Sequence, residues 1–285
     1  MDCIILSILL ILVILLILTT GYCAKNCNYI QQKFENFSNS ENSKSGLSIY
    51  GTATELPVVK KLNKNIRLCI FMVATPEIHH YSEFTIKQNK EWAKLHNYDF
   101  VLFDKKHKDT RDLPINFSKI QYAIDLIDTG LYDYVMYIDA DAIVHNLEYD
   151  IRNLIQEKMG KLSLKFSLFG EDCYNSKTCS KPGRINSGVF IVSRGIVGKE
   201  TMKLWLKSSR GSHAHLVNVF PNCQNIFTKG VYPWLSPFIG IIPFNIMNGF
   251  GDTLLIKHAM AMDDIQRIDE IKKEIRRTDE RIRVF

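Results

Sequence analysis

The apolar segment from Tyr134 to Ile138 constrains the fold more than any other part of the chain. Its aromatic and β-branched residues are typical of a strand that is buried in the middle of a sheet. Two aspartates, Asp139 and Asp141, follow this segment directly. Ligands of open α/β sheets bind beyond the carboxyl ends of the strands, and we therefore expect a binding site at these two residues.

The spacing of the two aspartates predicts a metal ion. Asp139 and Asp141 can face the same crevice if the chain between them stays extended. Carboxylates this close repel each other unless a cation lies between them, and a hard divalent ion that also binds substrate phosphates meets this need. The alternative is a solvated turn at the end of a strand, where aspartate is common. The apolar strand ahead of the pair favours the site over this alternative.

The segments around the aspartates predict an α/β fold with a mostly parallel central sheet. Strands are expected at 66–75, 99–104 and 134–138, with helices at 81–95 and around 120–127 between them. This alternating order is typical of a parallel sheet with right-handed crossovers. Beyond it we expect strands at 164–170, 185–192 and 253–257, a helix at 201–207, a loop at 245–252 and a C-terminal helix capped by Asp263.

Two helices have apolar positions that predict which face is buried. In the helix at 81–95 these are Tyr81, Phe84, Trp92 and Leu95, and in the C-terminal helix they are Ile265, Ile268, Ile271 and Ile275.

The N-terminus predicts a membrane anchor. Residues 3–18 are almost entirely Ile, Leu and Val, and with their flanks residues 3–20 are just long enough to span a membrane. A cleaved signal peptide is the alternative, but no basic residue precedes the run. We therefore expect an anchor at 1–20, a flexible stem at 21–64 and one domain at 65–285. Basic residues after the span favour a cytosolic domain, whereas sequons at Asn36 and Asn116 favour a lumenal one.

Composition limits the partners that this chain can have. The net charge is +6, but the densest basic cluster, at 272–283, is interleaved with acids, so we expect no nucleic-acid partner. No glycine-rich phosphate loop occurs, so metal and side chains would have to hold the phosphates of a bound nucleotide. Seven cysteines are present, of which Cys173 and Cys179 could close a disulfide or stay free.

Four motifs occur in a recognisable order. They are Ser118-Lys119-Ile120, the segment 137–142, the segment 186–190, and Gly251-Asp252 six residues before His258. With these motifs the chain resembles, over about residues 66–274, the α-glycosyltransferases grouped as family 34. The resemblance implies a single GT-A domain in a type II protein of the Golgi or ER membrane, with the domain in the lumen. It also implies a retaining transfer of a hexose or pentose from a UDP- or GDP-sugar to a glycan acceptor, with Mn²⁺ or Mg²⁺ as cofactor.

The resemblance further implies roles for single residues. The metal ligands would be Asp139, Asp141 and His258; the nucleotide-sugar would be bound by Thr75, Lys119, Asp139 and Gly188; and catalysis would involve Asn186 and Gln224. The family places acidic residues just before the glutamine, where this chain has Asn222 and Cys223.

Other interpretations remain open beside this one. The missing acids would suit a catalytically silent domain that only binds glycans or nucleotides. A phosphatase of the haloacid dehalogenase type also places two aspartates at a strand end, but the segment after Gly251-Asp252 lacks the later acid that it needs. His213 and His215 have the spacing of a metal pair, yet no third ligand lies near them in the sequence, which favours a surface loop.

Overall fold

The structure is a computed structural model, and it describes residues 53–172, 185–249, 253–260 and 262–284. The predicted anchor at 1–20, the Cys173–Cys179 pair and the Gly251-Asp252 motif lie outside these residues. Among the described residues, no helix is long and apolar enough to cross a membrane. Residues 53–64, which were predicted as the end of the stem, are hydrogen-bonded to the domain: the Val59 amide donates to Asn153 Oδ1 at 3.1 Å.

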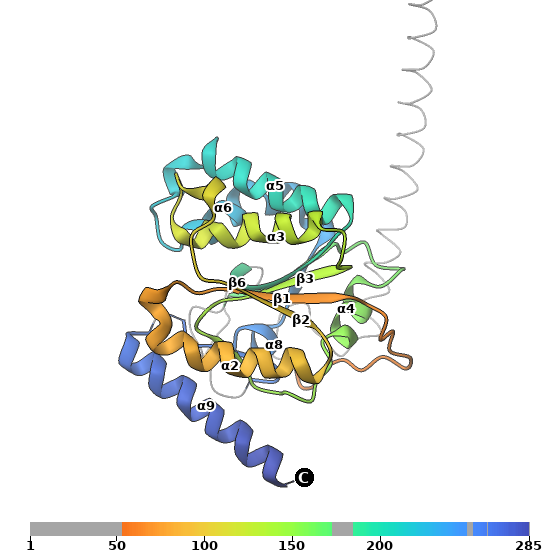
Figure 1. Ribbon diagram of the computed structural model, residues 1–285. Helices are drawn as coiled ribbons and strands as arrows, with labels where there is room; N and C mark the ends of the chain where they lie inside the picture. The colour runs from red at the N-terminus through yellow and green to blue at the C-terminus, as the bar shows by residue number, and fades with distance from the viewer. Residues whose placement is uncertain (1–52, 173–184, 250–252, 261, 285) are drawn as a thin grey trace, which may run out of the picture. The chain divides into compact units, whose positions relative to one another are not determined.

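A six-stranded sheet forms the centre of the domain (Figure 1). Its order is β2-β1-β3-β6-β5-β7, with bounds Asp99–Phe103, Leu68–Val73, Tyr134–Ile138, Ile185–Ser193, Ser167–Glu171 and Ile239–Ile242. Five strands run in the same direction, and β6 runs antiparallel to both of its neighbours. The α/β class with a mostly parallel sheet is therefore confirmed.

Helices cover both faces of this sheet. In Figure 1, helices α3, α5 and α6 lie above it, whereas α2 and α8 lie below it with α9 beside α2. The helices are α2 His79–Leu95, α3 Ser118–Asp128, α4 Arg152–Met159, α5 Ile196–Arg210, α6 Asn222–Gly230, α7 Tyr232–Leu235, α8 Phe244–Met247 and α9 Asp264–Val284. Short 3-10 turns span Pro76–Ile78, Lys108–Thr110, Ile115–Phe117, Ala214–Leu216 and Ser236–Phe238.

Aromatic side chains fill the core above the sheet. The ring centroids of Phe169 and Phe227 are 4.3 Å apart, and those of Trp205 and Phe227 are 4.7 Å apart. These three side chains are fully buried, and each such burial contributes roughly 1.5–3 kcal/mol. This core holds β5 and β6 rigidly against α5 and α6, which carry the walls of the site described below.

A second, two-stranded sheet lies beside the first. Strand β4, Ala142–Val144, pairs antiparallel with β8, Ile256–His258, so that Ala142 is opposite His258. The strand predicted at 253–257 is thus shorter than expected and includes His258. Because β4 begins one residue after Asp141, this pairing carries His258 to the aspartates.

Polar side chains of α2 complete the outer edge of β4. The side chain of Asn89 donates to Ala142 O at 2.9 Å and accepts from the Val144 amide at 2.9 Å. Thr85 Oγ1 donates to Ala140 O at 2.6 Å. The face of α2 that meets β4 is therefore polar. The predicted burial of Leu95 is wrong: this side chain, on the last residue of the helix, is 63% exposed.

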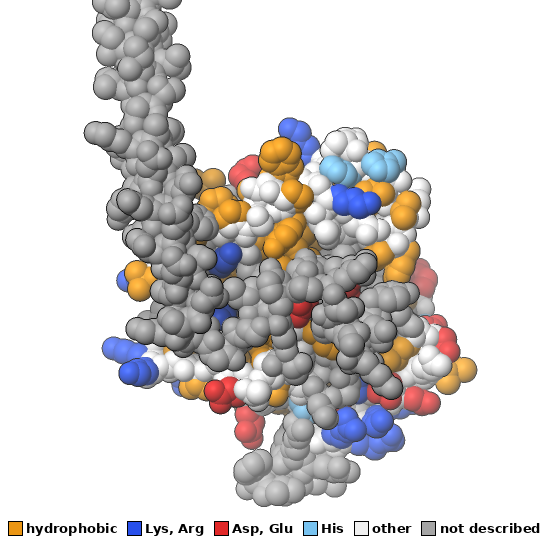
Figure 2. Space-filling model, turned by 180° about the vertical axis from the view of Figure 1, so that it is seen from behind, with side chains coloured by type: hydrophobic (Ala, Val, Ile, Leu, Met, Phe, Trp, Pro, Cys, Tyr) orange, Lys and Arg blue, Asp and Glu red, His pale blue; other side chains and the backbone are white. Residues whose placement is uncertain are grey.

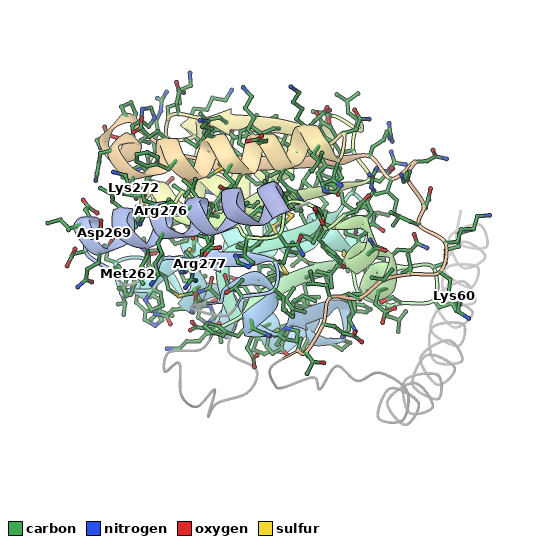
Figure 3. The ribbon with its side chains drawn as sticks, turned by 90° about the horizontal axis from the view of Figure 1, so that it is seen from below. Lys60, Met262, Asp269, Lys272, Arg276 and Arg277 are labelled. Carbon is green, nitrogen blue, oxygen red and sulfur yellow. The ribbon has the colours of Figure 1, made fainter. Side chains whose placement is uncertain are left out.

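The C-terminal helix α9 agrees with most of its predicted face. Asp263 Oδ1 accepts from the Gln266 amide at 2.9 Å, which confirms the cap. Ile271 is buried, but Ile265 is 75% exposed. In this first turn the contact with α2 is polar, since Asp264 Oδ2 lies 2.9 Å from His80 Nε2. Figure 3 shows α9 beside α2, with Asp269, Lys272 and Arg276 labelled along it. These three residues are exposed, so α9 has one apolar face and one charged face.

The remaining differences are short elements that the sequence pattern did not predict. The predicted loop at 245–252 begins with helix α8, and β4, α4, α6 and β7 were also not foreseen. His213 and His215 lie after α5, in and beside the 3-10 turn at 214–216; His213 is partly exposed and His215 is exposed, as expected of a surface segment. On the face shown in Figure 2, basic and acidic side chains are interspersed.

Candidate functional site

The structure brings Asp139, Asp141 and His258 together. Possible ligand atoms of all three lie within 4.8 Å of one another, and across the described residues no other cluster of this kind is found. His258 Nε2 lies 3.0 Å from Asp141 Oδ1 and 3.7 Å from Asp139 Oδ2. Two carboxylates and an imidazole at these separations have the chemistry of a site for Mn²⁺ or Mg²⁺.

Backbone hydrogen bonds fix this cluster. The Asp139 amide donates to Gly188 O on β6 at 2.7 Å, and the Ala142 amide donates back to Asp139 O at 3.0 Å, which turns the chain out of β3. The Ala259 amide then donates to Asp141 O at 3.0 Å. The two aspartates are thus tied to both sheets, and His258 is tied to the aspartates.

Asn248 orients the imidazole of His258. Its Oδ1 lies 3.2 Å from His258 Nδ1, so a proton on Nδ1 leaves Nε2 free to face the carboxylates. Such partners of a ligating histidine fix its tautomer and ring orientation. Asn248 is itself fully buried and its Nδ2 donates to Glu171 O at 3.3 Å. A side chain at Gly170 would lie 1.7 Å from this amide nitrogen, so the glycine makes the approach possible.

Gly188 has a comparable role beneath the cluster. A Cβ atom at this position would lie 2.2 Å from His258 Cε1 and 2.7 Å from Asp139 Oδ2. Any other residue would therefore displace His258 or Asp139. The resemblance assigned Gly188 to the nucleotide-sugar, and its direct neighbours in the structure are these two predicted metal ligands.

Lys119 compensates the charge of Asp139. It stands in the first turn of α3 and is almost fully buried; its Nζ donates to Ser187 O at 2.8 Å and lies 3.5 Å from Asp139 Oδ1. The Nζ also lies 4.7 Å from the centre of the Tyr137 ring. Tyr137 donates its hydroxyl to the same Oδ1. Burial, and then the charge of Asp139, raise the pKa of Tyr137 and keep it a hydrogen-bond donor.

Arg267 compensates the charge of Asp141. Its Nε lies 3.3 Å from Asp141 Oδ2, and its guanidinium stacks over the Tyr81 ring at 4.8 Å. Burial alone would raise the pKa of Asp141, but His258 and Arg267 hold it below its ordinary value. Burial alone would lower the pKa of His258, but Asp141 and Asp139 raise it. The two aspartates thus favour the protonated form of His258.

These residues lie in a pocket of about 970 Å³, a volume typical of small-molecule sites. Predicted residues that line it are Lys119, Asp139, Asp141, Asn186, Gly188, Gln224 and His258. Thr75 follows β1 and caps the turn at 76–78, but it is not among the residues that line this pocket. A role for Thr75 at the nucleotide therefore stays a prediction.

Asn186 on β6 and Gln224 on α6 also line the pocket. Asn186 is buried, and its Oδ1 accepts from the Gly188 amide at 2.7 Å, so that it shapes the backbone under the cluster. Gln224 Oε1 accepts from the Ser187 amide at 3.3 Å, and its Nε2 donates to Asp172 Oδ2 at 2.9 Å. Asn186 and Gln224 are therefore in the pocket, and their catalytic roles stay predictions.

Asn116 also belongs to the pocket wall. Its Nδ2 donates to Asn222 Oδ1, and the rest of its sequon, Phe117 and Ser118, is fully buried. A glycan on Asn116 would fill the pocket, so this sequon is poor support for a lumenal domain. The other sequon, at Asn36, lies outside the described residues.

Sequence reasoning missed three residues of the site. Arg267 on α9 and Asn248 beside the short helix α8 lie more than a hundred residues from the aspartates, and no local pattern marks them. Asp172 did carry a signal, because it follows the predicted strand at 164–170 in the same way that Asp139 follows β3.

No protein-family model and no curated protein sequence matches this chain. Solved structures do. A glycosyltransferase involved in the glycosylation of the major capsid of PBCV-1 has a TM-score of 0.58 at 15% identity, covering 73% of this chain and 99% of that one. The glycosyltransferase GlyE of Streptococcus pneumoniae TIGR4 has a TM-score of 0.39 at 14% identity, covering 64% and 46% of the two chains. The first of these likenesses shows that the chain has a fold used by a glycosyltransferase.

Proposed function

We propose that this chain is a metal-dependent glycosyltransferase that moves a hexose or pentose from a nucleotide-sugar to a glycan acceptor. The observation that carries the proposal is the convergence of Asp139, Asp141 and His258 at the carboxyl end of β3, inside a pocket. The fold shared with a glycosyltransferase supports it. That the transfer retains the anomeric configuration, as in family 34, is proposed from the sequence motifs alone.

Asp139, Asp141 and His258 would hold Mn²⁺ or Mg²⁺, and the ion would supply Lewis-acid stabilisation to the leaving diphosphate. The donor set fits such an ion, since His258 Nε2 is aimed at both carboxylates and its other nitrogen is held by Asn248. Lys119 and Arg267 hold the carboxylates of Asp139 and Asp141 in place, at 3.5 Å and 3.3 Å. Protein contacts therefore hold the proposed ligand side chains in place, which lowers the entropic cost of binding.

Nucleotide phosphates would be bound with little help from the backbone. The chain has no glycine-rich phosphate loop, and the cations that line the pocket are Lys119, Lys229 and Arg267. We propose a UDP- or GDP-sugar as donor. The location in the Golgi or ER membrane, with the domain in the lumen, likewise stays a proposal that rests on the apolar residues 3–20.

Titration with UDP and GDP, each with and without Mn²⁺, tests binding, and a screen of UDP- and GDP-sugars for Mn²⁺-dependent hydrolysis tests turnover. We expect nucleotide binding that depends on Mn²⁺ and release of free sugar from at least one donor. Binding without turnover of any donor would favour the silent binding domain. The absence of any Mn²⁺-dependent nucleotide binding would contradict the proposed function itself.

A further inference from the structure

Asp172 contributes a further carboxylate to the pocket, outside the predicted metal cluster. It directly follows β5 and lines the same pocket as Asp139 and Asp141. Its Oδ2 accepts a hydrogen bond from Gln224 Nε2 at 2.9 Å. Within the described part of the chain, no lysine or arginine forms an ion pair with it. Its negative charge is therefore held in place by a neutral amide.

A continuous row of polar contacts joins Asp172 to the metal cluster. Gln224 Oε1 accepts from the Ser187 amide at 3.3 Å, and Ser187 O accepts from Lys119 Nζ at 2.8 Å. Lys119 Nζ in turn lies 3.5 Å from Asp139 Oδ1. With its oxygen on Ser187, the Gln224 amide can present only its NH₂ group to Asp172. Gln224 thus positions Asp172 relative to β6, on which the metal cluster also rests.

The sheet sets the separation between the two acidic positions. Strands β3 and β5 run in the same direction on either side of β6, so their carboxyl ends lie at the same edge. Neighbouring strands are about 4.8 Å apart, so two strand spacings, about 10 Å, separate the backbones of β3 and β5. Asp139 meets Gly188 and Glu171 meets Ile185, so the two acids are also offset along β6. The pocket of about 970 Å³ that both acids line has room for a sugar bonded to a metal-bound diphosphate.

The two carboxylates of the metal cluster already have cationic partners. Asp139 is compensated by Lys119, and Asp141 is compensated by Arg267. Glycosyl transfer develops positive charge on the sugar as it passes through an oxocarbenium-like state. In a pocket that excludes water, a fixed negative charge near that position stabilises the transition state more than the ground state. Of the pocket carboxylates, Asp172 is the one available for this purpose.

We propose that Asp172 is a catalytic carboxylate that stabilises the positive charge on the transferred sugar, and that Gln224 positions it. This inference rests on the proposed function. In the step, the bond between the anomeric carbon and the diphosphate oxygen breaks, and its electron pair leaves with the diphosphate. The acceptor hydroxyl oxygen bonds to the anomeric carbon, and its proton passes to the departing diphosphate. Asp172 takes no proton in this step and forms no covalent bond.

A protonated sugar analogue tests the inference without requiring turnover. The probes are protonated gluco-, galacto- and manno-configured piperidine iminosugars, compared with the neutral hexoses, each titrated into the full chain with UDP or GDP and Mn²⁺. The wild type should bind at least one iminosugar about tenfold or more tightly than its neutral hexose. Asp172→Asn, which keeps the shape and can still accept from Gln224, should lose most of this preference and leave nucleotide affinity unchanged.

Two further variants keep the test decisive. Asp172→Glu keeps the charge and should retain part of the preference, whereas Asp128→Asn, which removes an exposed acid at the other end of α3 from Lys119, should retain all of it. If Asp172→Asn keeps the preference, or if the wild type binds Mn²⁺ and nucleotide but shows no preference, the role of Asp172 is wrong and the proposed function stands. If the wild type does not bind nucleotide with Mn²⁺, the proposed function and the inference are both overturned.

Discussion

The two walls of the pocket differ in how their charges are balanced. On the wall formed by β3, β4 and β8, each acid has a cationic partner: Lys119 for Asp139, and Arg267 for Asp141. On the wall formed by β5 and α6, Asp172 is bonded to a neutral glutamine. The first wall is suited to hold a metal ion and its diphosphate in a fixed position. The second wall is suited to stabilise the positive charge that develops on the sugar only during the reaction.

The largest expected effect is on the first wall. Asp141→Ala removes one predicted metal ligand and the carboxylate that Arg267 Nε contacts at 3.3 Å. We expect at least a 100-fold loss of Mn²⁺-dependent nucleotide binding, more than the 10- to 100-fold typical of removing a residue that only supports a ligand. Asp128→Asn is the control for removal of an acid. Titration of UDP or GDP at saturating Mn²⁺ measures the effect, and unchanged affinity in Asp141→Ala would remove this residue from the site.

Gly188→Ala should damage the same wall through packing. The added methyl group would lie 2.2 Å from His258 Cε1, so either the ring or β6 must move. Overpacking of this kind costs roughly 1–3 kcal/mol, and it should weaken Mn²⁺ binding at the same time. Gly195→Ala is the matched control, since its Cβ would meet its nearest atom at 3.6 Å. Thermal unfolding and Mn²⁺ titration of both variants would show whether the two glycines differ; equal behaviour would contradict the close packing at Gly188.

Asn248→Ala tests the orientation of His258 with a smaller change. Without the Oδ1 at 3.2 Å, the imidazole is free to rotate or to change its tautomer. Loss of such a partner typically costs 10- to 100-fold in metal affinity. We expect a decrease in that range for Mn²⁺, with the secondary structure unchanged in circular dichroism. An affinity equal to that of the wild type would mean that the two sheets alone hold His258 in place.

Gln224→Ala changes the second wall, and it should lower turnover rather than nucleotide affinity. If Gln224 positions Asp172, its loss should lower turnover about tenfold, which equals about 1.4 kcal/mol of transition-state stabilisation. Nucleotide affinity should change little, because the interaction matters mainly in the transition state. Steady-state kinetics with the active donor, compared with nucleotide titration, separate the two effects. Equal losses in both would place Gln224 with the nucleotide instead.

The smallest expected effect concerns the attachment of α9, which carries Arg267 to the first wall. Glu274 is fully buried beside His145 and Lys257. Burial alone would raise the pKa of Glu274, but His145 and then Lys257 lower it below its ordinary value of 4.5. Its contribution to stability is thus present above about pH 4.5 and is lost as the pH falls through the lowered pKa.

Glu274→Gln should therefore be less stable than the wild type at pH 6, and the difference should shrink between pH 4.5 and pH 3. The free energy of unfolding, measured against pH for both proteins, checks this. Lys273→Gln, on the exposed side of α9, is the control. A difference that stays constant from pH 6 to pH 3 would show that ionised Glu274 does not stabilise the docked helix.

The two walls also differ in how well the sequence predicts them. The first wall depends on β3, whose apolar residues and terminal aspartates are local signals, so both the strand and the site could be predicted. The position of His258 required the pairing of two three-residue strands, β4 and β8, and no periodic pattern is readable over three residues. Side chains of α2 complete the edge of β4, and polar residues on a buried helix face do not follow the apolar spacing that sequence reasoning uses.

Of the residues in the second wall, the sequence predicted only Gln224. Its acid comes from the end of another strand, 52 residues earlier in the chain, rather than from the positions just before the glutamine. A comparison with the family's motif around Gln224 therefore finds no acid at the positions just before the glutamine. Applied to β5, the rule that acids at the carboxyl ends of parallel strands gather at one edge would have included Asp172.

Crystals of the protein grown with Mn²⁺ and UDP or GDP test the central claim most directly, because the anomalous signal of manganese locates the ion. We expect one ion bound by Asp139, Asp141 and His258, with oxygen ligands at roughly 2.0–2.6 Å, and diphosphate oxygens completing its coordination. An ion bound at saturating nucleotide without His258 or either aspartate, or a nucleotide bound in the pocket with no ion between it and these residues, would contradict the account.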